Sequence, residues 1–175
     1  MFILNVIIWY VSSSFFNITF KKADISFIIM TSLQFFIGGL LSFSTSSVAC
    51  KSSKISAILF WLGNIATNMA LKFNKSTEVQ TLKMTEPIFA YVLSRAYYKK
   101  RITIDAECVS IFCFFLLTML SCYNSLNIHA VWCIFIANIA LQSRNLINKT
   151  LLESTDSFNV LSYAFLYATP LQLSF

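Results

Sequence analysis

The sequence predicts an all-α integral membrane protein, built as an antiparallel bundle of membrane-spanning helices. Its 175 residues are 57% hydrophobic and only 11% charged, which is less than half of the roughly 25% charge typical of soluble domains. Apolar runs return about every 20 to 30 residues, and about 20 apolar residues suffice for one bilayer crossing. Short polar connections separate these runs, so consecutive helices must run antiparallel. Almost no chain is left for an aqueous domain.

Seven spans are predicted along the chain. Their expected bounds are 1–20, 24–46, 55–73, 77–98, 103–123, 127–147 and 158–175. The first span has no basic leading region and no small-residue cleavage site, so we interpret it as a retained helix rather than a secretory signal. The second, fourth and sixth connections carry six Lys or Arg residues and the other three carry four. The rule that basic loops stay inside then places the N-terminus on the cytosolic side.

The composition also argues against several classes of function. The net charge is +6, but the basic residues lie between apolar runs and form no basic face, which argues against nucleic-acid binding. The five cysteines show no metal-ligand spacing and are expected to pack as small hydrophobic residues. The single histidine, His129, is expected at a helix boundary. No cofactor, metal site or catalytic constellation is predicted, so an enzyme is the weaker class.

The third span carries a polar face. Asn64, Thr67 and Asn68 stand at i, i+3 and i+4, which places them on the same side of a helix. Such side chains either form hydrogen bonds between helices or line a polar cavity. The sequence alone favours neither interpretation.

The fourth span contains the ionisable pair Lys83 and Glu86, followed by Pro87. A charge at mid-membrane costs about 2.5 to 3.5 kcal/mol, so each one requires an explanation. Either the pair binds helices together, or Lys83 keeps its ammonium for an anionic substrate while Glu86 is held elsewhere or serves conformational coupling. Gln80 lies on the same helical stripe as Lys83. Pro87 removes a backbone donor, which predicts a kink of the kind that a moving gate needs.

The sixth span presents a second polar stripe. Asn138, Gln142 and Asn145 lie on one face, and Arg144 is displaced from it near the predicted helix end. Arg144 either extends to the lipid headgroups, which is the ordinary behaviour of a basic residue there, or contributes its charge to a site.

Four motifs occur in order along the chain. They are Trp9 and Tyr10 with Asn17 and Lys21-Lys22, then residues 63–71, then residues 81–89 continuing through Val92, Leu93 and Ser94, and finally residues 143–146 with Lys149. Together they resemble the triose-phosphate/plastid phosphate translocator family of the drug/metabolite transporter superfamily, which is related to the nucleotide-sugar transporters. Within this group, Glu86 followed by Pro87 favours the phosphate translocators.

The resemblance implies a drug/metabolite transporter fold of about ten helices in two inverted five-helix repeats. This chain would supply the first repeat, the sixth helix and the start of the seventh. Residues 1–175 are therefore expected to form a single incomplete transporter domain, truncated or inactive as it stands. The implied activity is exchange of inorganic phosphate for phosphorylated three-, five- or six-carbon metabolites. A multi-pass protein of a plastid-type membrane (inner envelope or apicoplast) is favoured, with the Golgi and endomembranes as the alternative.

The resemblance also suggests roles for individual residues. Lys83 would bind the phosphate, and Asn64 and Thr67 would face the substrate. Gln80 stands where the family often has a histidine, so substrate preference is expected to differ. The full set of expected substrate-binding residues is Lys83, Asn64, Thr67, Gln80 and Arg144. Glu86, Pro87 and Asn68 are expected to serve gating or structure.

The expected partners are a phosphorylated small molecule, inorganic phosphate and the lipid bilayer, with no nucleic acid and with a homodimer left open. The nearest alternative function is a nucleotide-sugar transporter of the endomembrane system. A cationic-drug exporter is more distant, because such exporters need a buried carboxylate in the first helix and residues 1–20 contain none. An assembly subunit without transport activity is a third alternative.

Overall fold

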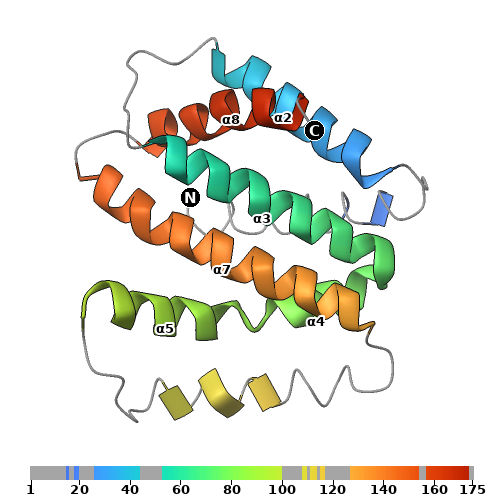
Figure 1. The fold of residues 1–175 in the computed structure, drawn as a ribbon, viewed down its shortest axis with the longest axis vertical. Helices are drawn as coiled ribbons and strands as arrows, with labels where there is room; N and C mark the ends of the chain where they lie inside the picture. The colour runs from blue at the N-terminus through green and yellow to red at the C-terminus, as the bar shows by residue number, and fades with distance from the viewer. Residues whose placement is uncertain are drawn as a thin grey trace.

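A computed structural model describes residues 15, 18–19, 26–43, 53–99, 108–109, 111–113, 115–116, 127–153 and 157–173. All regular elements in this part of the chain are α-helices, which confirms the all-α class. The helices are α2 (Phe27–Phe43), α3 (Ser53–Phe73), α4 (Ser76–Lys83), α5 (Glu86–Tyr97), α7 (Ile128–Leu151) and α8 (Ser157–Leu173), as Figure 1 shows. The spans predicted over 1–20 and 103–123 lie mostly outside the described residues.

The observed helices differ from the predicted spans in two ways. Instead of one continuous helix over 77–98, the chain forms α4 and α5 with two residues between them. Helix α7 extends to Leu151, about one turn beyond the predicted end at 147. Among the described helices, α7 alone is both long and apolar enough, by length and composition, to cross a membrane.

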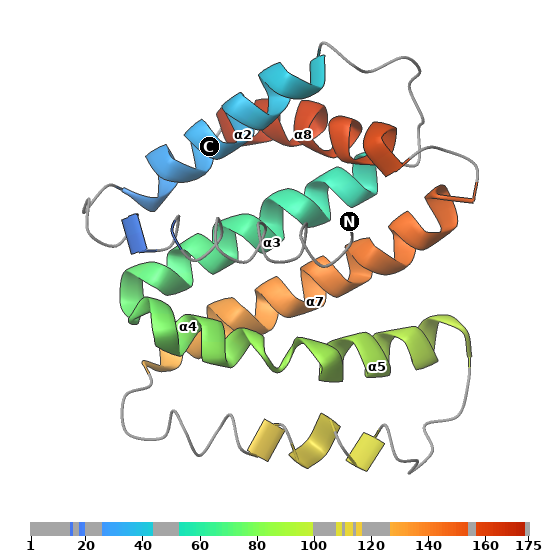
Figure 2. The same ribbon diagram turned by 180° about the vertical axis from the view of Figure 1, so that it is seen from behind.

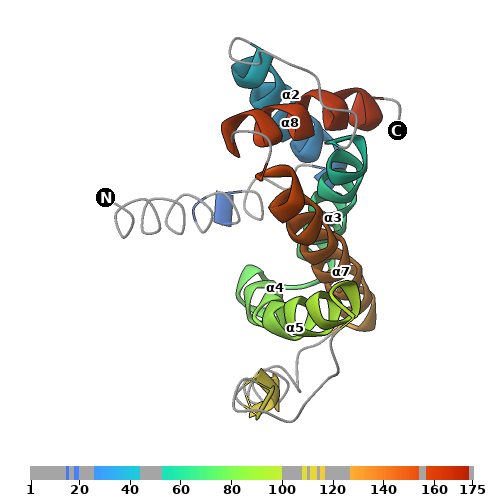
Figure 3. The same ribbon diagram turned by 90° about the vertical axis from the view of Figure 1, so that its left-hand side faces the viewer.

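Helices α3 and α7 form the centre of the molecule. They pack side by side and antiparallel. The direction follows from the Ser56 hydroxyl near the start of α3, which donates to Asn148 Oδ1 near the end of α7 at 2.5 Å. Helices α2 and α8 pack together and cover α3 on one side. Helices α4 and α5 lie along α7 on the other side (Figures 2 and 3).

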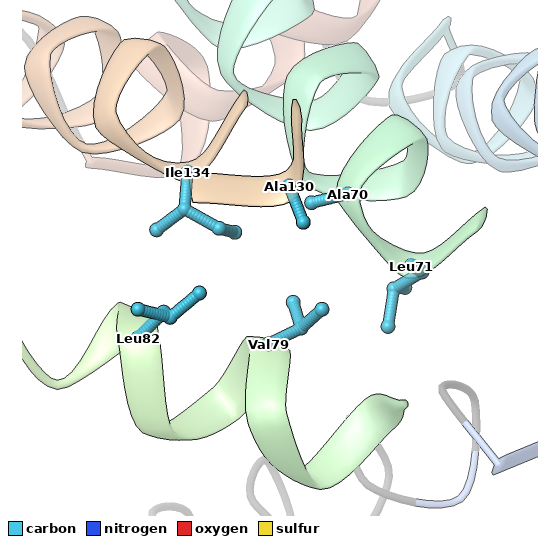
Figure 4. Close-up of a cluster of buried hydrophobic side chains, with 6 residues drawn as sticks. All are labelled: Ala70, Leu71, Val79, Leu82, Ala130 and Ile134. Carbon is cyan, nitrogen blue, oxygen red and sulfur yellow. The ribbon is translucent and has the colours of Figure 1, made fainter. Parts of the chain in front are cut away.

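An apolar cluster fixes α4 to the centre. It consists of Ala70 and Leu71 from α3, Val79 and Leu82 from α4, and Ala130 and Ile134 from α7, each at most 2% exposed. Figure 4 shows these side chains pointing toward one another from three helices. Helix α5 contributes nothing comparable, because none of its residues is buried. Of the two halves of the fourth span, α4 is therefore anchored by buried apolar side chains and α5 is not.

Aromatic rings and small residues join α2, α3 and α8. The rings of Phe35, Phe60 and Phe165 meet edge to face, with centroids 5.1 to 6.1 Å apart, an arrangement that aromatic pairs prefer. A Cβ atom at Gly38 would collide with the Phe165 ring, and one at Gly39 would lie 2.8 Å from Thr169 Oγ1. The glycine pair thus allows α8 to approach α2 closely, as small residues do between membrane helices.

Side-chain amides organise the turn that joins α3 and α4 and the start of α7. Asn74 Oδ1 accepts a hydrogen bond from the backbone N–H of Asn127 at 3.2 Å. Asn127 in turn caps α7, because its Oδ1 accepts from the backbone N–H of His129 at 2.9 Å. His129 therefore lies in the first turn of α7, which confirms its predicted place at a helix boundary.

A stripe of apolar side chains on α7 is exposed. It comprises Ile128, Trp132, Phe135, Ile136 and Ile139, which follow one another at helical spacing. An exposed apolar surface of this kind is typical of contact with lipid or with another protein segment.

Candidate functional site

The candidate site surrounds the break in the fourth span. Helix α4 ends at Lys83 and α5 begins at Glu86, with Met84 and Thr85 forming a turn between them. Pro87 is the second residue of α5, and having no N–H it cannot donate to the Lys83 carbonyl as a continuous helix would require. The kink predicted at Pro87 is thus a short turn over Met84 and Thr85, whose backbone stays in the αR region and makes i→i+3 hydrogen bonds.

Thr85 closes this turn and ties it to α7. Its hydroxyl donates to the Leu82 carbonyl at 2.8 Å and accepts from Asn138 Nδ2 at 3.1 Å. Asn138 is fully buried, and its Oδ1 has no hydrogen-bond partner in the described part of the chain. A buried acceptor left unpaired costs about 1 to 3 kcal/mol. Such groups are rare in native structures and call for an explanation at the place where they occur.

The carboxylate of Glu86 is also held by α7. Gln142, which is 8% exposed, donates its amide Nε2 to Glu86 Oε1 in a short hydrogen bond. Its other end, Oε1, accepts from Asn145 Nδ2 at 3.5 Å. The polar stripe predicted on the sixth span therefore faces the break in the fourth span.

Lys83 has a different environment from Glu86. Its side chain is half-buried, and it forms neither an ion pair nor a hydrogen bond with any described residue. No hydrogen bond or close ion pair joins Lys83 to Glu86 among the described residues, although the Glu86 carboxylate lies near enough to act on the ammonium electrostatically. Gln80, one turn before Lys83, is also half-buried.

The polar face of α3 divides into two kinds of residue. Asn64 Nδ2 donates to the Phe60 carbonyl at 2.7 Å, and the Thr67 hydroxyl donates to the Gly63 carbonyl at 2.8 Å, both within their own helix. Asn68 instead donates to the Thr31 hydroxyl on α2 at 2.8 Å and is buried. Asn68 thus joins two helices, whereas Asn64 and Thr67 hold no neighbouring helix by hydrogen bonds.

Arg144 lies in the interface between α7 and α3. Its guanidinium carbon is 4.1 Å from the centroid of the Phe60 ring, which is a cation–π geometry. Its Nε is buried and has no hydrogen-bond partner in the described region. Because α7 continues to Leu151, Arg144 is not at a helix end. Its guanidinium is directed toward α3, and the choice between a headgroup contact and a role in a site stays a prediction.

The structure brings together residues that the sequence had assigned to separate features. Glu86 contacts Gln142, and Thr85 contacts Asn138. Neither Thr85, Asn138 nor Gln142 was among the expected site residues. The spacing of polar residues along the sixth span indicated a polar face there. It did not indicate which helix that face contacts. Among the described residues, no group of three or more His, Cys, Asp or Glu side chains could hold a metal ion.

Comparison with known proteins gives two matches. Residues 2–175 match the model of the Triose-phosphate Transporter family. The chain is also 29% identical to phosphoenolpyruvate/phosphate translocator 1, a chloroplastic protein of Oryza sativa subsp. japonica, over 89% of this chain and 43% of the translocator. The chain thus spans less than half the length of that relative. No solved structure matches it.

Proposed function

Because this chain belongs to the Triose-phosphate Transporter family, we propose that it acts in a multi-pass membrane antiporter that exchanges inorganic phosphate for phosphorylated three-, five- or six-carbon metabolites. The family membership agrees with the motifs of the sequence and supports a membrane transporter over an enzyme. The name of the chloroplastic relative from Oryza sativa supports phosphoenolpyruvate as the first metabolite to test and a plastid membrane as the location. In this proposal the described helices belong to a ten-helix fold of two inverted repeats.

The observation that carries the proposal is that the Lys83 ammonium forms no hydrogen bond or close ion pair with the part of the chain that the structure describes. An unpaired charge in a low-dielectric interior is expensive, and the nearest carboxylate along the chain, Glu86, is bound to Gln142 instead. A phosphate group would supply the missing negative charge and accept hydrogen bonds from the ammonium. Lys83 is therefore the proposed phosphate ligand.

A phosphate dianion in a low-dielectric site needs more than one cation. Arg144 is the proposed second cation, since its guanidinium offers several donors in a planar fork that suits phosphate oxygens. Asn64, Thr67 and Gln80 are the proposed polar contacts with the rest of the substrate. Their half-buried side chains are of the types that orient a ligand by hydrogen bonds.

The break between α4 and α5 supports transport by alternating access. Interrupted helices at mid-membrane are a recurring feature of transporter binding sites, where part of the bundle moves around a fixed site. Glu86, Pro87 and Asn68 are proposed to serve this movement or the structure around it. Binding of the substrate would favour the closed arrangement, because only a bound anion neutralises Lys83.

The experiment is exchange transport by the purified protein, produced from its full coding sequence and reconstituted in liposomes loaded with inorganic phosphate. We expect uptake of external phosphate and of phosphoenolpyruvate, and loss of both in Lys83→Ala. The matched control is Lys75→Ala, because Lys75 is exposed at the start of the same span. Unchanged exchange in Lys83→Ala would remove Lys83 from the site. Uptake of nucleotide sugars without phosphate exchange would instead support the endomembrane alternative.

A further inference from the structure

We propose that Gln142 is a positioning residue, whose amide holds the Glu86 carboxylate against α7 and so keeps the Lys83 ammonium free to bind phosphate. The inference rests on the proposed function, since it adds a residue to the same site. It assigns to Gln142 no contact with the substrate. The residue acts only by controlling which partner the Glu86 carboxylate takes.

The first support is the geometry of the amide. Gln142 is almost fully buried on α7, and its Nε2 donates to Glu86 Oε1. The Asn145 amide donates to Gln142 Oε1 from the other side, at 3.5 Å. This second contact, at the upper limit of hydrogen-bond distance, is consistent with the N–H end of the Gln142 amide facing the carboxylate. Hydrogen bonds to an ionised acceptor are stronger than neutral ones, so the bond is well suited to holding Glu86.

The second support is the register of α7 against the break. Asn138 and Gln142 are one helical turn apart on α7, and they bind the consecutive residues Thr85 and Glu86. The Thr85 bond lies in the buried interior. Two adjacent amides of α7 therefore fix the start of α5, and Glu86 is held as part of that arrangement rather than by an isolated contact.

The third support is the arrangement that Gln142 prevents. Lys83 and Glu86 are three residues apart, a spacing at which opposite charges pair readily on helices. In a low-dielectric interior the attraction between them is strong. A closed Lys83–Glu86 pair would cancel the positive charge that phosphate requires. The described residues contain no close pair of this kind, and Gln142 instead donates to Oε1 of the carboxylate.

The test compares three variants of the full-length protein in liposomes. Gln142→Met keeps an unbranched side chain of similar length and removes the N–H donor. Glu86→Gln removes the carboxylate charge. The double variant combines both changes. The matched control is Asn148→Leu. It removes a different hydrogen bond of α7, the one that Asn148 accepts from Ser56 on α3.

We expect Gln142→Met to raise the KM for inorganic phosphate about tenfold or more. The apparent affinity is the intrinsic affinity multiplied by the fraction of molecules in which Lys83 is free, and this fraction should fall. The double variant should recover the KM of Glu86→Gln, since no carboxylate is then present to capture Lys83. Asn148→Leu should leave the KM unchanged. A purely structural role for Gln142 predicts the opposite for the double variant, namely no recovery.

A second readout does not depend on transport. Without phosphate, the rate at which an amine-acylating reagent modifies Lys83 is measured by mass spectrometry of the peptide that contains it. Acylation requires the neutral amine, and an ion pair with Glu86 would stabilise the charged ammonium. Gln142→Met should therefore slow the modification, and the added Glu86→Gln should restore its rate. If wild-type protein fails to exchange phosphate, the proposed function is wrong, and the modification rates still decide the role of Gln142. Equal rates in wild type and Gln142→Met would overturn the inference.

Discussion

The two sides of helix α3 differ in the continuity of the helices that pack there. Toward α2 and α8 the contacts combine aromatic edges, around a Phe35 that is only 1% exposed, with side-chain hydrogen bonds such as Asn68 to Thr31. Toward α7, and through α7 toward the break in the fourth span, the contacts include amides, a hydroxyl and a carboxylate. The first region leaves little room for movement. The second contains the turn between α4 and α5, together with Lys83 and the buried Asn138 Oδ1, neither of which has a hydrogen-bond partner among the described residues.

The largest expected effect on stability is in the aromatic region. Phe35→Ala should lower the free energy of unfolding by about 3 to 5 kcal/mol, because it removes a ring from a closely packed site. The neighbouring Phe36 is 49% exposed, so Phe36→Ala should cost less than about 0.5 kcal/mol. Thermal unfolding in detergent would measure both. Equal losses would show that the aromatic cluster is not the rigid part of the molecule.

In the polar region, a substitution at Lys83 should raise the free energy of unfolding rather than lower it. Lys83→Met removes a charge that is costly inside the membrane and should raise the free energy of unfolding by about 2 kcal/mol, while phosphate exchange is lost. Lys75→Met, at an exposed position, should change neither quantity. Stability and exchange are measured on the same preparations. A Lys83→Met protein that is less stable than wild type would mean that the ammonium is satisfied by the fold and not left for a ligand.

Close approach between α3 and α7 should be the next most sensitive feature. A Cβ atom at Gly63 would lie 2.6 Å from Leu141 Cγ, so Gly63→Val should destabilise the protein by about 1 to 3 kcal/mol through overpacking. Leu62→Val, one residue earlier on the more exposed side of α3, serves as the control and should have little effect. A tolerated valine at Gly63 would indicate that the two central helices are not packed at this distance.

The smallest effects should distinguish the polar residues of α3. Asn68→Leu breaks the bond to Thr31 on α2 and should cost about 0.6 to 2 kcal/mol, the range for hydrogen bonds between membrane helices. Asn64→Leu removes a bond only within α3, so it should affect stability less and phosphate exchange more. Unfolding and exchange measurements on both variants test this division. The reverse pattern would assign the substrate contact to Asn68.

The sequence was sufficient for the fold class and for much of the helix pattern. Hydrophobic runs of membrane length predict helices directly, and capping residues such as Asn127 mark their starts. The position of the break was less accessible. Pro87 signals a missing backbone bond, but only the tertiary contact of Thr85 with Asn138 places the turn before it.

The partner of Glu86 could not have been predicted from one sequence. Lys83 is three residues away in the chain, whereas Gln142 is 56 residues away, and local spacing favours the nearer residue. Which amide of α7 meets the carboxylate depends on the register of α7 against α5. The α5–α7 contact includes the rings of Phe89 and Phe135, whose centroids are 4.7 Å apart, and it depends on tertiary packing rather than on local propensity. The contact of Arg144 with Phe60 was not predictable either, since it depends on how α7 packs against α3.

The most direct measurement is protection of Lys83 by inorganic phosphate. The reconstituted protein is treated with an amine-acylating reagent at increasing phosphate concentration, and the modified peptides are quantified by mass spectrometry. If Lys83 binds phosphate, its modification should fall with a saturable dependence on phosphate, while modification of the exposed Lys75 should stay constant. If both lysines react at rates that phosphate does not change, the ammonium is not the phosphate ligand and the account is contradicted.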